Sequence, residues 1–398
     1  MNPRERVLAA SRGEDVDRIP WSPRLDLWFL ARRARGTLPT EYANCDLVDI
    51  ARSLGCASHM AQGADTTRLA DRDLSLRGLG LDNHADYPFR IRVEGLPVRF
   101  ERDSENQRTW IETPAGTIHT HLHQDQEMLR RGISLPFVQS YAVESAEDLE
   151  ALGIVFDHLR VEPNPEGFGA FCRHVGEQGL PVARGPVAAS PLHLMLHELM
   201  PMERFFYLYR DCRDELYELA RHIEPLYEAM LQALCDSQAE VVLWGANYDR
   251  DITSPRFFER EMMPWLQRAA QRLHAANKLM LCHTDGENNH LLPLYRQCGF
   301  DIAESVCPTP MTELSLPQIR DGLGPEIAVW GGIPSVVLLD EAMDDAAFEA
   351  YLDALFTEMG DGHRLVLGVA DNVPPDANWS RLLAIGGRIR AHGPVVGA

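Results

Sequence analysis

The sequence predicts an α/β fold in which eight parallel strands, each followed by a helix, close into a barrel. Short apolar runs alternate with longer amphipathic stretches along the whole chain, which is the pattern of repeated β-α units. Eight such runs are present, and eight is the number of strands that closes a parallel barrel. No low-complexity linker interrupts the 398 residues, so we expect one domain over residues 1–398.

The predicted strands are apolar runs too short to form helices, at 18–24, 57–62, 181–186, 240–244, 279–283, 300–303, 327–330 and 365–369. Helices are predicted where apolar residues recur at three-to-four spacing, at 3–12, 46–54, 145–152, 191–235 and in the stretch that Ser254 and Pro255 open. The crossovers are long enough for right-handed β-α-β links. Together these elements predict a TIM-type (β/α)8 barrel.

One region departs from this alternation. From about residue 89 to residue 124, single apolar and polar residues alternate between turn signals, which predicts an antiparallel hairpin region inserted into the barrel. His119, His121 and His123 recur at period two within it and therefore share one face of a strand. Because no carboxylate or cysteine accompanies them at a strand end, we expect surface histidines here rather than metal ligands.

Composition and charge exclude several classes of partner. A formal net charge of −21 disfavours nucleic acid and anionic membranes as partners. Eight cysteines form no C-x-x-C pair, so we expect reduced thiols. The sequence shows no signal-peptide pattern and no apolar run of membrane-spanning length. We therefore expect a cytoplasmic protein that acts on a small molecule.

The densest group of chemically useful side chains follows the fifth predicted strand. Residues 279–288 read LMLCHTDGEN, so an apolar run ends in His283, Asp285 and Glu287. In a barrel, the C-terminal ends of strands carry the catalytic residues. A His-x-Asp pair there could ligate a metal, act as acid and base, or hydrogen-bond a ligand. The structural alternative is a histidine paired with a carboxylate that only stabilises a loop.

Polar residues also follow other predicted strands: Arg24 and Asp26 after the first, Asn247, Tyr248 and Asp249 after the fourth, Glu304 and Cys307 after the sixth, and Asp371 and Asn372 after the eighth. If the barrel closes, all of them converge on one mouth. This convergence favours a catalytic site more strongly than any single motif, because loop capping would have to arise independently at each strand.

Three stretches resemble the uroporphyrinogen decarboxylase superfamily, namely NPRERVLAASRGEDVDRIPW at the start, ITSPRFFEREMMPWLQRAAQRLHAANKLMLCHTDG in the middle and VLGVADNVPPDANWSRL near the end. The resemblance covers essentially the whole chain and implies a TIM-type barrel. It also implies one of two chemistries. One branch decarboxylates a tetrapyrrole without cofactor or metal. The other consists of cobalamin-linked methyltransferases in which zinc activates a substrate heteroatom.

The methyltransferases that this chain resembles carry His-x-Cys-Gly at the fifth strand and a further Cys at the last strand. His283 matches, whereas Asp285 stands in place of the first Cys, and the last-strand position falls near Val369 with Asp371 close by. The resemblance therefore implies a zinc ion held by His283, Asp285 and Asp371. Glu304 or Cys307 is the alternative third ligand. Zinc accepts histidine and carboxylate ligands, and such a site suits an oxygen or nitrogen leaving group.

The leading hypothesis is a zinc-assisted methyltransferase that moves a methyl group from a small O- or N-methylated compound to the cobalt of a separate corrinoid protein. The predicted catalytic residues are His283, Glu287, Tyr248 and Asn247. The predicted substrate-binding residues are Arg24, Asp26, Trp244, Asp249 and Asn372. The corrinoid protein would dock at the barrel mouth, and a homodimer is a possible assembly.

Two alternatives remain open. The decarboxylase branch carries an arginine-rich segment after its first strand. Arg32, Arg33 and Arg35 resemble this segment only in part, because the contiguous Arg-Gln-Ala-Gly-Arg pattern is missing. A polycarboxylate substrate also suits an acidic mouth poorly, so this alternative ranks second.

The third hypothesis is a non-catalytic binding paralogue that keeps the barrel and the pocket. Saturable ligand binding without product would distinguish it.

Overall fold

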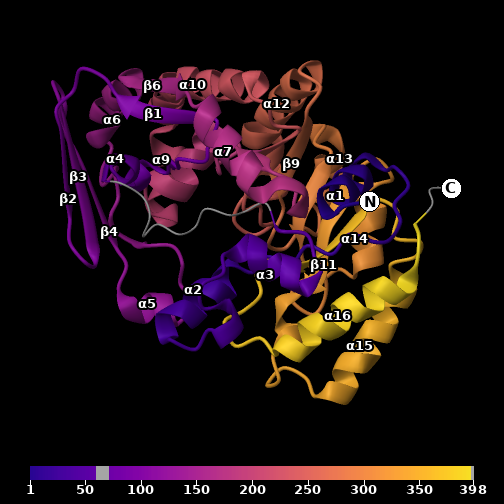
Figure 1. The fold of residues 1–398 in the computed structure, drawn as a ribbon. Coiled ribbons are helices and arrows are strands. Elements are labelled where there is room, and N and C mark those ends of the chain that lie inside the picture. Colours follow the sequence, from indigo (N-terminus) through magenta and orange to yellow (C-terminus); the bar gives the residue numbers. More distant parts are fainter. Residues whose placement is uncertain (60–70, 396–398) are drawn as a thin grey trace.

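A six-stranded parallel sheet forms the centre of the molecule (Figure 1). The computed structural model describes residues 1–59 and 71–395. The strands lie side by side in chain order, and each neighbouring pair is parallel. They are β7 (Val182–Arg184), β8 (Val241–Ala246), β9 (Leu279–His283), β10 (Ile302–Val306), β11 (Ala328–Pro334) and β12 (Leu365–Ala370). The predicted parallel α/β architecture is therefore confirmed.

The prediction of eight strands in a closed barrel is only partly met. The first predicted strand contributes one isolated parallel bridge, from Trp21 to Leu367 in β12. Of the second, residues 60–62 lie outside the described residues, and Ser58 makes one parallel bridge to Gly179, just before β7. A backbone hydrogen bond from Ala57 N to Trp21 O, 2.7 Å long, connects these two segments. The first predicted strand makes two backbone hydrogen bonds to β12, from Ser22 N to Leu367 O and from Leu367 N to Pro20 O, at 2.8 and 2.9 Å. A few backbone contacts thus stand where the sequence predicted complete strands.

The predicted helices are present; the first has the predicted bounds, 3–12, and the boundaries of the others differ. The first six are α1 (Pro3–Arg12), α2 (Asp26–Arg35), α3 (Leu47–Leu54), α4 (Asp71–Leu74), α5 (Gln126–Arg130) and α6 (Asp148–Asp157). The helical region predicted at 191–235 divides into α8 (Pro191–Leu194), the π-helix η5 (Met195–Leu199), α9 (Met202–Asp211) and α10 (Arg213–Asp236). The remaining helices are α7 (Pro165–Val175), α11 (Pro255–Phe257), the π-helix η6 (Phe258–Met262), α12 (Met263–Ala275), α13 (Leu292–Cys298), α14 (Leu316–Leu323), α15 (Asp345–Glu358) and α16 (Trp379–His392).

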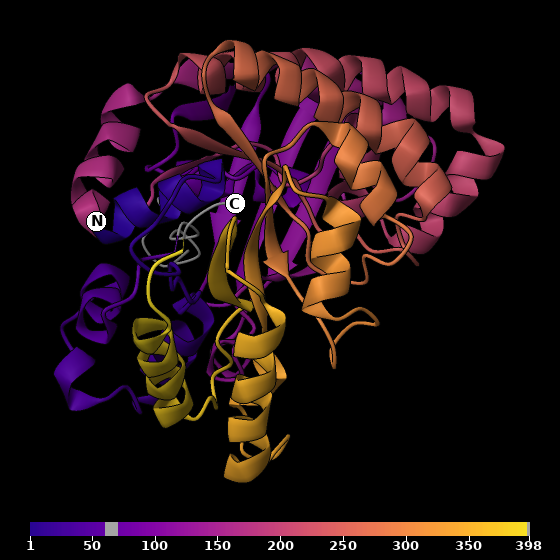
Figure 2. The same ribbon diagram turned by 90° about the vertical axis from the view of Figure 1, so that its right-hand side faces the viewer.

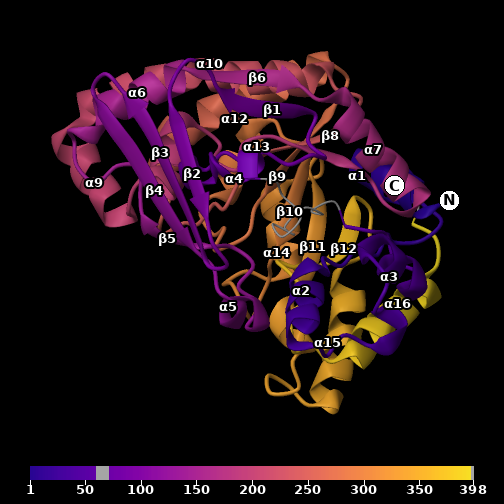
Figure 3. The same cartoon turned by 60° about the vertical axis from the view of Figure 1, so that its left-hand side comes forward.

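The inserted region is larger than one hairpin. Strand β1 (Phe89–Val93) pairs antiparallel with β6 (Leu159–Pro163), which lies outside the predicted insertion. Strands β2 (Val98–Arg102), β3 (Asn106–Thr113), β4 (Gly116–His123) and β5 (Phe137–Ser140) form a separate antiparallel sheet (Figure 3). Local alternation revealed β1 to β4. It could not reveal β5 and β6, because these partner strands lie after residue 124.

The three histidines of β4 occupy one face, as their period-two spacing predicts. His121 Nε2 and His123 Nδ1 both contact Oδ1 of Asn106, at 3.0 and 3.2 Å, and His119 stacks on Trp110. Each of these contacts is made by a partly buried side chain within the antiparallel sheet. They account for the histidines as structural residues of this sheet.

The apolar core follows from burial of the parallel strands on both faces. Every residue of β8, β10, β11 and β12 is buried. This explains why these strands read as continuous apolar runs without alternation. Helices of the C-terminal half, orange and yellow in Figure 2, pack outside the strands.

No helix among residues 1–59 and 71–395 combines the length and apolar character needed to cross a bilayer. All eight cysteines are free thiols.

Gly331 in β11 is the glycine on which the sheet depends most directly. Its φ is +140°, and a Cβ added there would lie 2.6 Å from the backbone nitrogen of Val306 in β10. The register between these strands shifts at this point, between Glu304 and Val306. We therefore expect Gly331→Ala to lower the free energy of unfolding by about 1–3 kcal/mol. Chemical denaturation of both proteins measures the change.

Gly387→Ala is the matched control. Gly387 lies inside α16, and its added Cβ would meet nothing closer than Arg390 Nη2 at 4.0 Å. A glycine inside a helix costs about 0.5–1 kcal/mol relative to alanine, so this variant should be as stable as the native chain or more stable. Equal stability of the two variants would contradict the role assigned to Gly331.

Candidate active site

The carboxyl ends of β9, β10 and β12 bring polar side chains to one edge of the parallel sheet. His283 is the last residue of β9 and pairs in register with Glu304 of β10. Asp371 directly follows the last residue of β12. Parallel strands place such residues at a common level, because all of them end in the same direction. The side chains predicted from separate strands therefore meet here.

A short hydrogen bond joins His283 to Glu304. The His283 Nδ1 to Glu304 Oε2 distance is 2.5 Å, and the two residues are 8% and 1% exposed. The other oxygen of Glu304, Oε1, lies 3.1 Å from Nε2 of His59. The His59 ring in turn contacts the edge of Trp330, with ring centroids 5.1 Å apart. Glu304 is thus a buried carboxylate held between two imidazoles.

The second nitrogen of His283 faces two further carboxylates. Its Nε2 lies 3.4 Å from Oδ1 of Asp285 and 3.7 Å from Oδ1 of Asp371. Oδ1 of Asp285 is buried and accepts no hydrogen bond from any described residue. We call His59, His283, Asp285, Glu304 and Asp371 the His283 cluster.

Arg24 closes one side of this cluster. Its Nη1 donates to Oδ1 of Asp371 at 2.6 Å, and its Nε donates to Asp26 at 3.1 Å. With its amide oriented to satisfy both neighbours, Asn372 donates to Asp26 at 2.7 Å and accepts from Arg24 at 3.2 Å. The Arg24 side chain is 17% exposed, so two carboxylates and one amide hold a mostly buried guanidinium.

The charges of the cluster shift the pKa values of its members. Burial alone would lower the pKa of His283, but the charges of Glu304 and Asp285 outweigh burial and hold it well above its usual value. Burial would likewise raise the pKa of Glu304, and the charge and hydrogen bonds of His283 and His59 hold it far below its usual range. Arg24 and His283 lower the pKa of Asp371 against the effect of burial. The structure thus favours a protonated His283 among ionised carboxylates.

This arrangement determines which atom of His283 can do chemistry. Nδ1 is occupied by Glu304, so Nε2 is the nitrogen available to a substrate or an ion. A carboxylate bound to one imidazole nitrogen fixes the tautomer and the ring orientation, as it does in metal and acid-base sites. Nε2 can therefore donate a proton when His283 is charged, or bind a cation when it is neutral.

The family model described as Uroporphyrinogen decarboxylase (URO-D) matches residues 128–390, which is more than half of the chain. The chain belongs to the uroporphyrinogen decarboxylase family. Among solved structures, a methyltransferase from Methanosarcina mazei matches with a TM-score of 0.51 and 16% sequence identity, covering 98% of this chain and 99% of that chain. At this identity the likeness shows the fold alone. No curated protein sequence matches the chain.

Seven of the predicted site residues of this family member lie together: Arg24, Asp26, His283, Asp285, Glu304, Asp371 and Asn372. Cys307 follows β10, and the charges of Asp285 and Asp371 are among the causes that, after burial, raise the pKa of its thiol to about 12. A thiol of this kind is mostly protonated at neutral pH in the metal-free chain.

The predicted residues of the β8 and β9 loops have structural partners. Asp249 accepts backbone hydrogen bonds from Glu287 and Asp251, at 3.0 and 2.8 Å. Glu287 accepts from the backbone of Asn289 and Glu313, both at 2.8 Å. Both carboxylates therefore stabilise turns of these loops. Nothing in these contacts directs either one toward Nε2 of His283.

Tyr248 and Trp244 belong to the core. Tyr248 is 0% exposed and packs its ring against Phe258, with centroids 5.3 Å apart. Trp244 is 1% exposed, and its indole Nε1 donates to the carbonyl oxygen of Ala189 at 3.4 Å. Burial raises the pKa of Tyr248 well above its usual value. Their predicted catalytic and substrate-binding roles receive no support from these positions.

Sequence reasoning missed two histidines of this family member. His59 was read as part of an apolar strand, although it is the second partner of Glu304. His197 lies on the π-helix η5, where its Nδ1 contacts Glu198 at 2.6 Å and its Nε2 lies 3.0 Å from Nδ2 of Asn247. Asn247 has a φ of 58°, which orients it for this contact. Only the π-helical distortion could have indicated His197, and it has no sequence signature.

The zinc site that the family resemblance implies is only partly formed. Two zinc ligands with bonds of about 2.0–2.1 Å in tetrahedral geometry lie roughly 3.4 Å apart, which is the separation of His283 Nε2 and Asp285 Oδ1. Asp371, however, is bound by Arg24. Within the described residues, no three His, Cys, Asp or Glu side chains are grouped closely enough to hold a metal ion. The residues therefore do not fit a complete three-ligand zinc site in this arrangement.

Proposed function

We propose that the chain is a methyltransferase in which His283 activates a small O- or N-methylated compound by proton donation. The observation that carries this proposal is the geometry of His283. Its Nδ1 is fixed by buried Glu304, and its Nε2 lies at the carboxyl ends of the strands beside Asp285 and Asp371. Membership of the family and the fold shared with a methyltransferase agree with this choice.

In the proposed step, the bond between the methyl carbon and the donor heteroatom breaks, and its electron pair stays on the heteroatom. That atom takes the proton from Nε2 of His283. Protonation is needed because an alkoxide or amide anion is a poor leaving group, whereas the neutral alcohol or amine is a good one. Glu304 keeps His283 in the protonated form and in one orientation. Arg24, held by Asp26 and Asp371, forms the polar wall beside the leaving group.

The acceptor in this proposal is the cobalt of a separate corrinoid protein. A low-valent corrinoid is a strong nucleophile and supplies the electron pair for the new bond. The chain's own contribution is to hold the methylated compound with its heteroatom at Nε2. The net charge of −21 favours a partner whose docking surface is less acidic than this chain.

The test is an anaerobic assay with the full chain, free cob(I)alamin and a panel of methyl donors that includes methoxylated aromatic compounds, methanol and methylamines. Saturable loss of the cob(I)alamin absorbance with one class of donor, and recovery of the demethylated product in equal amount, would support the proposal. Saturable donor binding without product would overturn it in favour of the non-catalytic binding paralogue.

Zinc binding stays a prediction, and it depends on whether Asp371 can leave its ion pair with Arg24. Because Arg24 binds Asp371, the native chain purified without chelators is expected to contain well below one zinc per molecule. Arg24→Gln should raise the zinc content, since it frees the Asp371 carboxylate for His283 and Asp285 to share an ion with it. Elemental analysis measures both. About one zinc per native chain, lost in Asp285→Asn, would instead establish the three-ligand site and a Lewis-acid reaction.

Decarboxylation remains the second candidate because the matching family model carries that description. The contacts of Arg24, Arg32 and Arg35 do not favour it. Arg32 donates to the carbonyl oxygen of Pro375 at 2.9 Å, and Arg35 bonds Asp376 at 2.5 Å. Both therefore bind the loop after β12, and Arg24 is already neutralised by two carboxylates. Release of carbon dioxide from a tetrapyrrole carboxylate by the purified chain would reverse this ranking.

A further inference from the structure

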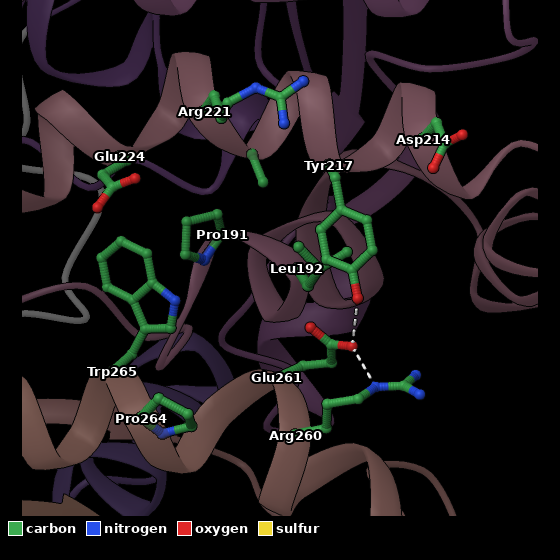
Figure 4. Close-up of a pocket in the computed structure, with 11 residues that line it drawn as sticks. Pro191, Leu192, Asp214, Tyr217, Arg221, Glu224, Arg260, Glu261, Pro264 and Trp265 are labelled. Carbon is green, nitrogen blue, oxygen red and sulfur yellow. Dashed lines mark hydrogen bonds and ion pairs between the residues drawn. The ribbon is translucent and has the colours of Figure 1, made fainter.

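A cavity of about 460 Å³ lies between α10 and α12, outside the parallel strands and apart from the His283 cluster (Figure 4). Its volume is within the range of roughly 300–1,000 Å³ that is typical of small-molecule sites. One face of α10 forms one wall, η6 and the start of α12 form the opposite wall, and Pro191 and Leu192 of α8 form the floor. We call it the α10–α12 cavity.

A buried carboxylate points into this cavity. Glu261 is 7% exposed, and its Oε1 accepts hydrogen bonds from Tyr209 at 2.6 Å, Tyr217 at 2.7 Å and Arg260 at 2.6 Å. No described residue donates to its other oxygen, Oε2. Figure 4 shows this oxygen directed away from Tyr217, toward Leu192 and the middle of the cavity. An accessible carboxylate oxygen on a mostly buried side chain is a specific acceptor for a donor group of a ligand.

The surrounding charges favour a cation. The lining carries Asp214, Glu224 and Glu261 against Arg221 and Arg260. Both guanidinium groups are engaged, since Arg221 pairs with Glu218 outside the cavity and Arg260 pairs with Glu261. Glu224 is engaged as well, because its Oε1 accepts a hydrogen bond from Arg268 Nη1 at 2.9 Å. Asp214, in contrast, has no hydrogen bond or ion pair to the described part of the chain. The acceptors that remain for a ligand therefore outnumber the donors.

The rest of the lining is apolar and aromatic. Trp265 faces Tyr217 across the opening in Figure 4, and Leu192 and Pro191 lie beneath them. Such walls bury the hydrocarbon part of a small ligand, and polar groups fix its orientation. Glu261 is carried by the π-helix η6, a distortion that recurs at functional sites.

We infer that the α10–α12 cavity binds a small organic ammonium ion, with its charged nitrogen on Glu261 Oε2 and its apolar body between Trp265 and Leu192. This inference goes beyond the proposed function. Its test needs no methyl transfer, so the failure of either proposal can be recognised separately.

The experiment is isothermal titration calorimetry of the full chain with three probes of similar shape: benzylammonium, benzyl alcohol and benzoate. Benzylammonium is expected to bind about ten-fold more tightly than either of the other two, because only its nitrogen is both a cation and a hydrogen-bond donor. Glu261→Gln should remove that preference. Asp214→Asn, a change at an exposed residue, should weaken benzylammonium binding to a lesser degree.

Trp265→Leu and Trp110→Leu are a matched pair of variants. Each tryptophan is partly exposed and carries an arginine over its ring, Arg268 at 4.8 Å and Arg99 at 3.8 Å, but Trp110 lies in the distant strand β3. Only Trp265→Leu should weaken binding, again by about ten-fold. Equal affinity for the three probes, a preference for benzoate, or equal loss in both tryptophan variants would each overturn the inference.

Discussion

Replacing His283 with alanine is expected to lower kcat/KM for methyl transfer roughly 10²–10⁴-fold, which is the usual contribution of a positioned acid. His283 is the one imidazole whose Nε2 lies between Asp285 and Asp371, at 3.4 and 3.7 Å. Without its proton, the heteroatom would have to leave as an anion. The assay with cob(I)alamin and the methyl donor found for the native chain measures the change.

Two further measurements distinguish a chemical role of His283 from a structural one. Added imidazole should restore part of the activity of His283→Ala, because it can occupy the space and supply the missing proton. His174→Ala is the control, since His174 is a half-exposed histidine on α7 that pairs with Asp46. This control should retain full activity. If His283→Ala remains folded and transfers methyl groups at the native rate, the proposed function is wrong.

Replacing Glu304 with alanine is expected to lower the free energy of unfolding by about 3–5 kcal/mol. The variant leaves the buried imidazoles of His283 and His59 without the carboxylate that both of them contact. Glu304→Gln should cost less, because an amide oxygen can still accept one hydrogen bond. Urea denaturation of the three proteins at one pH measures the order.

The pH dependence of this effect tests its cause. The pKa of Glu304 is lowered by folding, so its contribution to stability is complete above about pH 4.3 and is lost as the pH falls through the folded pKa. The pKa of His283 is raised by folding, so its contribution is complete below about pH 6.5 and is lost as the pH rises through the folded pKa. The stability difference between the native chain and Glu304→Ala should therefore be largest between about pH 4.5 and 6.5.

Glu326→Ala provides the reference for this series. The Glu326 side chain is 87% exposed and pairs only loosely with Arg364, at 3.9 Å. Its removal should change the free energy of unfolding by no more than about 0.5 kcal/mol, without a maximum in the same pH range. A difference for Glu304→Ala that does not vary with pH would indicate a packing defect rather than loss of an ion pair.

Several parts of this molecule could be read from local sequence. The parallel strands were visible because burial on both faces requires continuous apolar runs, as in LMLCH at 279–283. The group formed by His283, Asp285, Glu304 and Asp371 was predictable because parallel strands end on the same side of a sheet. Helix α1 was visible from the spacing of its apolar residues, and the structure adds a capping box of Asn2 and Glu5 at its start.

Other features depended on contacts that no local pattern encodes. Glu287 was predicted to be catalytic and Asp249 to bind substrate, but their loops fold so that backbone amides donate to both carboxylates. Arg24 binds Asp371 across 347 positions of sequence, and this pairing decides how complete a metal site can be.

By itself, then, the sequence determined where the buried parallel strands lie and that polar side chains follow their carboxyl ends. Both can be read locally, because they depend only on hydrophobic periodicity and chain direction. Only the tertiary structure decided which partner each side chain has. Burial and charge pairing between distant segments fixed Glu304 between His59 and His283 and left Oε2 of Glu261 open to the α10–α12 cavity. Such pairings depend on three-dimensional distance, which the linear order of residues does not specify.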